Sequence, residues 1–125
     1  MFVINDDLSI YITRGDSAVF SVGAYIGEEQ HTFQVDDVVR FKVFEKKNCE
    51  EVVLKKDVKV TEPTSLVEIA LDREDTRIGD VISKPTDYWY EVELNPDGYA
   101  QTIIGYDEDR AKVFKLYPEG GVINE

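Results

Sequence analysis

The clearest indication of the fold comes from residues 88–104, which read YWYEVEL, NPDG and YAQTII in three consecutive pieces. In the first piece, aromatic and aliphatic residues at every second position alternate with Trp89, Glu91 and Glu93. A two-residue period is typical of a β-strand with one buried face. In the second piece, Pro96 fixes φ and Gly98 tolerates the positive φ that closes a hairpin. We therefore predict an antiparallel hairpin whose second strand lies within residues 99–106.

Alternating apolar residues recur on both sides of this hairpin. The runs that show them are residues 8–12, 18–24, 39–43, 52–60, 67–71 and 112–117. Short alternating runs at intervals of roughly ten residues predict an all-β chain folded into an antiparallel β-sandwich of about eight strands. The tight-turn sequence Arg14-Gly15-Asp16 predicts that the first two runs form a hairpin. The polar residues 27–34 predict a loop.

One segment departs from the strand pattern and predicts a short helical turn over residues 72–79. Asp72 is suited to cap a helix N-terminus, acidic residues fill the first turn, and Gly79 suits the position after the last turn. The chain has 125 residues, 42% hydrophobic content and no linker-like stretch. We therefore predict a single β-sandwich domain over residues 1–125.

The charge balance restricts the partners. The chain has 14 Lys and Arg against 26 Asp and Glu, a net charge of −12, without a cluster of basic residues. A polyanion repels such a protein, so we expect no nucleic-acid partner. No apolar run approaches about 18 residues and no basic amphipathic helix is evident, so we expect no membrane partner. A single cysteine and a start without a signal-peptide pattern favour folding in the cytoplasm.

Residues that carry enzyme chemistry are sparse. His31 and Cys49 are the only histidine and the only cysteine, too few for a zinc site. The polar surroundings of His31 favour an ordinary loop residue, and the glutamates that follow Cys49 oppose a reactive thiolate. We predict no catalytic residue, no cofactor and no metal ion, and a protein that is not an enzyme.

Two acidic clusters leave calcium open as an alternative. Residues 72–75 and 107–109 offer carboxylates, which calcium prefers, but neither cluster has EF-hand spacing. We interpret the first cluster as acids at a helix start and the second as a solvated turn. Residues 14–16 also spell the tripeptide that integrins recognise, and we interpret this tripeptide as a turn.

Trp89 is the strongest candidate for a contact residue. The alternation that buries its neighbours places Trp89 on the same face of the strand as Glu91 and Glu93. Exposed tryptophans are frequent in protein interfaces, so we predict a protein interface at these three residues. The alternative is that residues 80–87 or a second sheet cover Trp89.

The order of these signals resembles a family of phage proteins. The segments that carry the resemblance are ITRGDSAVF (12–20), RFKVF (40–44), LDREDTRIGD (71–80), YWYEVEL (88–94), QTII (101–104) and KVFKL (112–116). Over residues 8–116 the chain resembles small prophage structural proteins and the N-terminal domain of the phage upper baseplate protein. The resemblance implies an immunoglobulin-like β-sandwich and a non-enzymatic component of a phage tail or baseplate.

Two functions follow as hypotheses. The first is an assembly protein that contacts itself as a homo-oligomer, or other phage structural proteins, and passes from the cytoplasm into the virion. The second is a binding module for a carbohydrate or other small ligand, in which acidic loops hold calcium or hydroxyl groups. Its stacking surfaces would be Trp89, Tyr88, Tyr90 and Tyr99. Assembly that depends on concentration would favour the first, and a melting temperature sensitive to chelators would favour the second.

Overall fold

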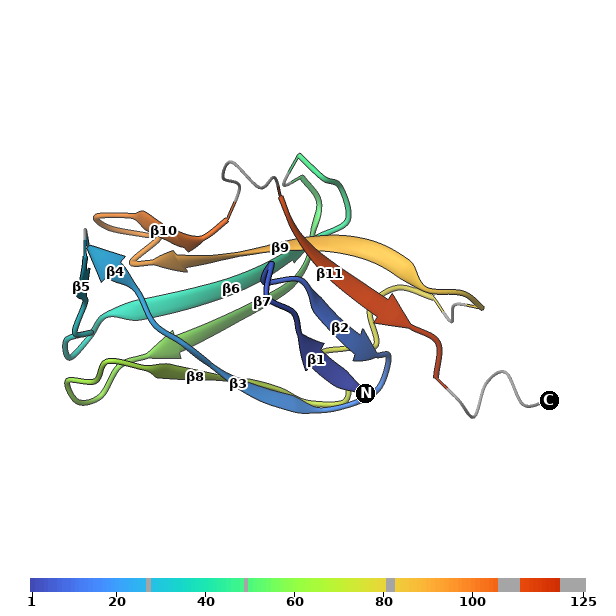
Figure 1. Cartoon of the computed structure of the whole chain (residues 1–125), viewed down its shortest axis with the longest axis horizontal. Helices are drawn as coiled ribbons and strands as arrows, with labels where there is room; N and C mark the ends of the chain where they lie inside the picture. The colour runs from blue at the N-terminus through green and yellow to red at the C-terminus, as the bar shows by residue number, and fades with distance from the viewer. Residues whose placement is uncertain (27, 49, 81–82, 106–110, 120–125) are drawn as a thin grey trace.

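A computed structural model describes residues 1–26, 28–48, 50–80, 83–105 and 111–119, and these residues form an all-β sandwich (Figure 1). The strands in chain order are β1 (Phe2–Ile4), β2 (Ile10–Thr13), β3 (Ala18–Val22), β4 (Tyr25–Ile26), β5 (Glu29–Gln30), β6 (Val38–Phe44), β7 (Val52–Lys59), β8 (Val67–Leu71), β9 (Thr86–Leu94), β10 (Gln101–Ile104) and β11 (Lys112–Tyr117). No helix occurs among the described residues, and so none that could span a membrane.

The strands form two packed layers and a short ribbon. The larger sheet has the order β1-β2-β11-β9-β6-β7, and β10 pairs with the C-terminal part of β9. The second layer consists of β3 and β8, while β4 and β5 make the ribbon. In Figure 1 β8 runs beside β7, and β3 passes below β1 and β2. The predicted sandwich is confirmed, and the immunoglobulin-like strand order stays a prediction.

Strand direction departs from the prediction in one place. Every strand pair among the described residues is antiparallel except β2 with β11, which run parallel. Alternation reports which face of a strand is buried and is the same for both directions, so the pattern could not reveal this pair.

The core lies between the two sheets and contains most of the apolar residues of the alternating runs, although Leu8 and Val52 are exposed. Phe41 on β6 is fully buried at its centre, with ring centroids 5.4 Å from Phe20, 5.5 Å from Tyr90 and 6.1 Å from Phe114. Phe20 comes from the small sheet and the other three from the large one, so these rings join the layers. Leu116, predicted like Phe114 to face inward, is also fully buried.

The hairpin between β9 and β10 is confirmed, with a different residue in the strained position. Asn95 has φ +49°, and its carbonyl accepts a hydrogen bond from the Gly98 amide at 3.0 Å. Gly98 itself has no positive φ. Asparagine tolerates this region, and here its side-chain oxygen also accepts the Val38 amide at 2.8 Å. The turn is therefore tied to the start of β6.

The prediction that the first two runs form a hairpin is wrong. β2 pairs with β1 and β11 in the large sheet, whereas β3 pairs with β8 in the small one. The tight turn exists, with φ +87° at Gly15 and a 3.0 Å hydrogen bond from the Asp16 amide to the Thr13 carbonyl. It carries the chain from one layer to the other, because Ile12 and Phe20 bury against the same core from opposite sheets.

The segment predicted as a helical turn is a hydrogen-bonded turn without a helix. Asp72 and Asp75 bind each other's backbone amides, at 2.8 Å for the Asp72 carboxylate and 2.9 Å for the Asp75 carboxylate. Gly79 has φ +65°, as expected at the end of such a segment. Thr76, which is fully buried, turns its hydroxyl to the crossing between the sheets instead of solvent. This tertiary contact overrides the local preference for a helix.

The polar stretch 27–34 is more structured than predicted. Residues of β5 pair with β4 in a two-residue ribbon. Phe33 is fully buried and exchanges backbone hydrogen bonds with Thr64, at 2.7 and 3.1 Å. One aromatic residue in a polar run has no periodicity, so alternation did not select it.

Candidate interaction surfaces

The three predicted interface residues lie together on the outer face of β9. Trp89 is half-buried, and register places it between Phe44 of β6 and Val113 of β11. Phe44 is only 2% exposed although it faces away from the core. Trp89 therefore belongs to an apolar row across three strands. It is neither fully exposed nor fully covered.

The two glutamates beside Trp89 share one cation. Lys42 Nζ lies 2.6 Å from Glu93 Oε1 and 3.4 Å from Glu91 Oε1, and each of the three side chains is about one-fifth exposed. Burial by itself lowers the pKa of Lys42, but the two carboxylates outweigh this effect and raise it. Glu91 and Glu93 are thus engaged within the sheet and are not free charges that face a partner.

A second ion-pair cluster continues this pattern along the outer face. Arg40 contacts Asp57 at 2.7 Å and Asp97 at 3.0 Å. The hydrogen bond from Arg40 lowers the pKa of Asp57. The outer face of the large sheet is therefore crossed by charges that pair with one another.

The Arg14-Gly15-Asp16 tripeptide serves the fold, which confirms its interpretation as a turn. Arg14 donates to the Gly79 carbonyl at 2.9 Å and forms an ion pair with Glu119 at 3.2 Å. The Asp16 carboxylate pairs with the amino terminus of Met1. Both charged side chains of the tripeptide are thus already occupied.

The acids near residue 75 are paired in the same way. Lys56 Nζ lies 2.9 Å from Asp75, and Arg77 lies 2.7 Å from Glu74. In the described part of the chain, no three His, Cys, Asp or Glu side chains are grouped as a metal site requires. The second acidic cluster, residues 107–109, and Cys49 lie outside the described residues.

Two of the tyrosines assigned to ligand stacking cannot have that role. Tyr88 and Tyr90 are 9% and 4% exposed, and the Tyr90 hydroxyl donates to the Leu8 carbonyl. Burial raises the pKa of Tyr90 above its usual value. The prediction that these two tyrosines stack on a ligand is therefore wrong, because rings that lie in the core have no face free for a ligand. Tyr99, by contrast, is 84% exposed.

A surface that the sequence-based reasoning missed lies on the small sheet. The outer face of β3 and β8 presents exposed side chains with a single charge among them. These residues are Val19, Ser21, Glu68 and Ala70. Val19 is 59% exposed. The signal was visible in the sequence, because residues 17–26 contain no charged residue in a chain that is 32% charged.

The edge of β3 is open as well as uncharged. Among the described residues, β3 pairs only with β8. Of the two edge strands of the large sheet, β1 is also uncharged, whereas β7 carries Lys55, Lys56, Asp57 and Lys59. Charged side chains protect an edge strand from pairing with another chain. β7 has this protection, and β3 lacks it.

Comparison with known proteins adds no relative. No family model, curated protein or solved structure matches this chain. A proposal about function therefore depends on the residues and surfaces of the chain itself.

Proposed function

We propose that the chain is a non-enzymatic structural component of a phage or prophage tail or baseplate. It works by protein–protein assembly with copies of itself or with other phage structural proteins. It is synthesised in the cytoplasm and becomes part of the virion. The sequence resemblance supplies the setting, and the observation that carries assembly is the uncharged, open edge of β3.

The backbone and the side chains of β3 support assembly together. An open edge offers N–H and C=O groups in a row, which an extended segment of a partner pairs with by strand addition. Val19 supplies apolar area that association removes from water. The flanking Ser21 and Ala70 are small, so Glu68 is the one long side chain on this face that a partner has to displace.

The net charge of the chain favours contact through surfaces that carry few charges. Two copies at −12 each repel one another, and the repulsion is weakest where their contact surfaces carry few charges. The β3 face meets that condition with Glu68 as the one charge on its strands. Salt screens the long-range repulsion, over about 8 Å at 0.15 M, so self-association through this face strengthens as salt is added.

The test is solution mass by light scattering on a sizing column, over a range of protein and salt concentrations. We expect the mass to rise with both to a defined oligomer. Val19→Lys places a charge on the β3 face and is expected to return the protein to a monomer. Val35→Lys is the matched control, because Val35 is also exposed, at 52%, and lies outside β3 and β8.

Each outcome has a clear meaning. A monomer under every condition would overturn self-assembly. Equal effects of the two lysine variants would overturn the assignment to β3. Loss of assembly in Trp89→Ala but not in Val19→Lys would move the contact to the outer face of the large sheet. A melting temperature that falls on addition of a chelator would favour the ligand-binding module instead.

A further inference from the structure

The strand β1 is a second open edge, in the other layer of the sandwich from β3. Among the described residues it pairs only with β2, and its side chains Phe2, Val3 and Ile4 carry no charge. Val3 and Ile4 are both 42% exposed. The ring centroids of Phe2 and Phe20 lie 6.0 Å apart, and β3 passes below β1 in Figure 1. The open edges of the two layers therefore lie on the same side of the molecule.

The hydrogen bonds of β1 show which of its backbone groups face outward. The Met1 carbonyl and the Asn5 amide form hydrogen bonds across the β1–β2 hairpin, at 3.0 and 2.9 Å. In an antiparallel pair, residues whose N–H and C=O groups both point to the neighbouring strand alternate with residues whose groups both point away. Val3 therefore points its groups to β2, as its two flanking positions in this alternation do. The groups of Phe2 and Ile4 point to the open edge.

We infer that the partner at these edges is a second copy of the chain, related to the first by a two-fold axis that passes beside Val3. The inference rests on the proposed self-assembly and gives it a geometry. When Val3 lies opposite the partner's Val3, Phe2 of each copy lies opposite Ile4 of the other. Their outward N–H and C=O groups then bond to one another, and the two large sheets continue across the axis.

The two layers explain why a second copy fits. A two-fold axis between antiparallel edge strands is perpendicular to their sheet, so each layer of one copy meets the same layer of the other. Pairing through β1 therefore brings the β3 edges of the two copies to the same contact. A partner that covers both layers needs two uncharged edges with the separation of β1 and β3, and a second copy has both. A single added strand covers one edge.

Charge favours this side of the molecule for a contact between copies that repel one another. Each copy carries a net charge of −12, and residues 1–5 and 17–26 contain no charged side chain. Exposed apolar side chains also gather on the N-terminal hairpin, and the contact removes part of their area from water. These side chains are Met1, Val3, Ile4 and Leu8.

The experiment that tests the axis is a disulfide across it. The central pair of the contact is not hydrogen-bonded, so the two Val3 Cα atoms lie about 4.5 Å apart. A disulfide joins Cα atoms that are about 4.4–6.8 Å apart. Cys49→Ser removes the only native cysteine. In that background, Val3→Cys is expected to form a covalent dimer under mild oxidation, at the protein concentrations where light scattering shows a dimer.

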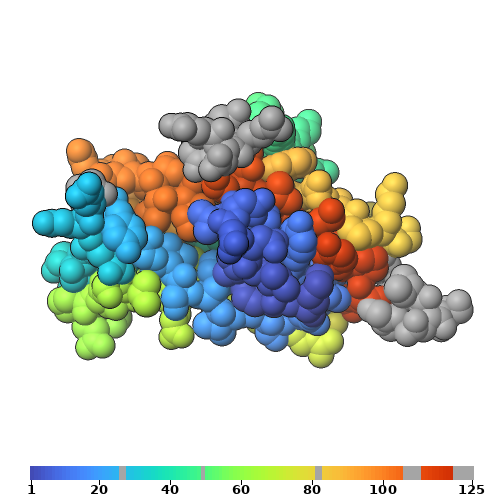
Figure 2. Space-filling view, viewed as in Figure 1, coloured from blue at the N-terminus to red at the C-terminus, as the bar shows by residue number. Residues whose placement is uncertain are grey.

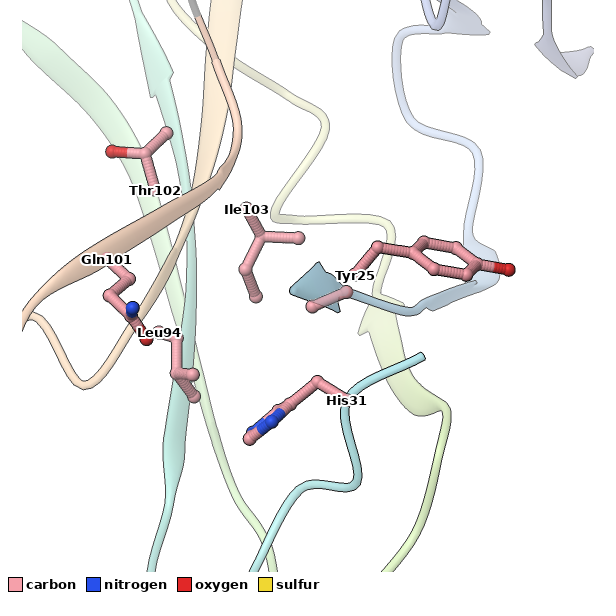
Figure 3. Close-up of a pocket in the computed structure, with 7 residues that line it drawn as sticks. Tyr25, His31, Leu94, Gln101, Thr102 and Ile103 are labelled. Carbon is pink, nitrogen blue, oxygen red and sulfur yellow. The ribbon is translucent and has the colours of Figure 1, made fainter. Parts of the chain in front are cut away.

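Two further cysteine variants control for chance collision. Val53→Cys lies on β7, the other edge strand of the same sheet, and Val53 is 38% exposed, close to Val3. Tyr25→Cys lies on the β4–β5 ribbon, beside the small pocket drawn in Figure 3, and Tyr25 is 69% exposed. Thiols across an axis have an effective concentration on the order of millimolar, so we expect both controls to cross-link at least about tenfold more slowly than Val3→Cys.

The backbone pairing of β1 has a separate test by solution mass. Proline lacks the N–H group and is tolerated on an edge strand where that group faces solvent. Ile4→Pro therefore leaves the hydrogen bonds between β1 and β2 in place but removes one donor per copy from the contact. We expect its dimer to have a dissociation constant at least about tenfold higher than that of Ile4→Ala, which shortens the same side chain and keeps the amide.

The outcomes separate this geometry from the proposed function. If light scattering shows an oligomer but Val3→Cys cross-links no faster than its controls, the two-fold axis is overturned and assembly through β3 stands. Equal dissociation constants for the two Ile4 variants would also contradict pairing through β1. Fast cross-linking of Val3→Cys that Val19→Lys leaves unchanged would support the axis and overturn the assignment to β3. A monomer at every concentration would overturn both.

Discussion

The Thr76 hydroxyl ties the turn that follows β8 to the segment that crosses from β2 to β3. Its Oγ1 accepts a hydrogen bond from the Gly15 amide at 2.9 Å and donates to the Asp16 carbonyl at 2.8 Å. Thr76 is fully buried and Gly15 is buried with it. Thr76→Val keeps the shape of the side chain and removes both hydrogen bonds. We predict that this change destabilises the crossing between β2 and β3.

The magnitude follows from the two groups that lose their partner. Each orphaned buried polar group costs about 1–3 kcal/mol, and the added methyl group recovers part of this, so we expect a net loss of about 3 kcal/mol. For 125 residues, an unfolding entropy of about 2.1 cal/mol/K per residue converts this into a fall in Tm of about 10 °C.

The assay is calorimetry together with urea unfolding of three variants. Thr76→Ser retains the hydroxyl and is expected to lose at most about 1 kcal/mol. Thr61→Val makes the same chemical change at an exposed site and is expected to lie within about 0.5 kcal/mol of the wild type. The reasoning is refuted if Thr76→Val matches the wild type, or if the serine variant is as unstable as the valine variant.

Three further changes test other parts of the fold. Gly15→Ala forces a side chain into φ +87° and places its Cβ 2.7 Å from Glu119 Oε1, so urea unfolding should show a loss of about 1–3 kcal/mol. Lys42→Met leaves two half-buried carboxylates unpaired, and we expect a loss of stability that shrinks in urea unfolding at high salt. Burial raises the pKa of Asp75, but the hydrogen bond from the Asp72 amide and the ion pair with Lys56 outweigh this effect and lower the pKa. The ionised Asp75 therefore stabilises the fold above about pH 4, and this stabilisation is lost as the pH falls through the lowered pKa. Asp75→Asn should therefore cost about 1 kcal/mol at pH 7 and progressively less as the pH falls below about 4, whereas a cost that does not change with pH would contradict the assignment.

The sequence predicts the faces of the strands well, because a face depends only on neighbours in the chain. Residues 88–94 have the buried and half-buried positions that alternation assigns to them, and Phe114 and Leu116 are buried as predicted. Which strands pair with one another depends on residues that are far apart in the chain, so the sequence pattern predicts the pairing less well. The turn at Gly15 has the composition of a hairpin, but its amide bonds to Thr76, 61 residues away, and the chain crosses between layers.

The candidate site shows the same division. Alternation placed Trp89, Glu91 and Glu93 on one face, and they lie there. It could not supply Lys42, which pairs with both glutamates from the neighbouring strand and balances one of their two negative charges. The absence of charge in residues 17–26 is a property of the sequence itself and points to the β3 surface without any structure.

Assembly through β3 is tested by amide hydrogen exchange of this strand in dilute and in concentrated protein. If copies assemble through the open edge, exchange of the Ala18–Val22 amides slows as concentration rises, while amides at the charged edge of β7 exchange as before. Figure 2 shows the neighbouring N-terminal strands at the surface, and their amides report the β1 contact on the same molecule. If exchange in β3 is independent of concentration, assembly through this strand is contradicted.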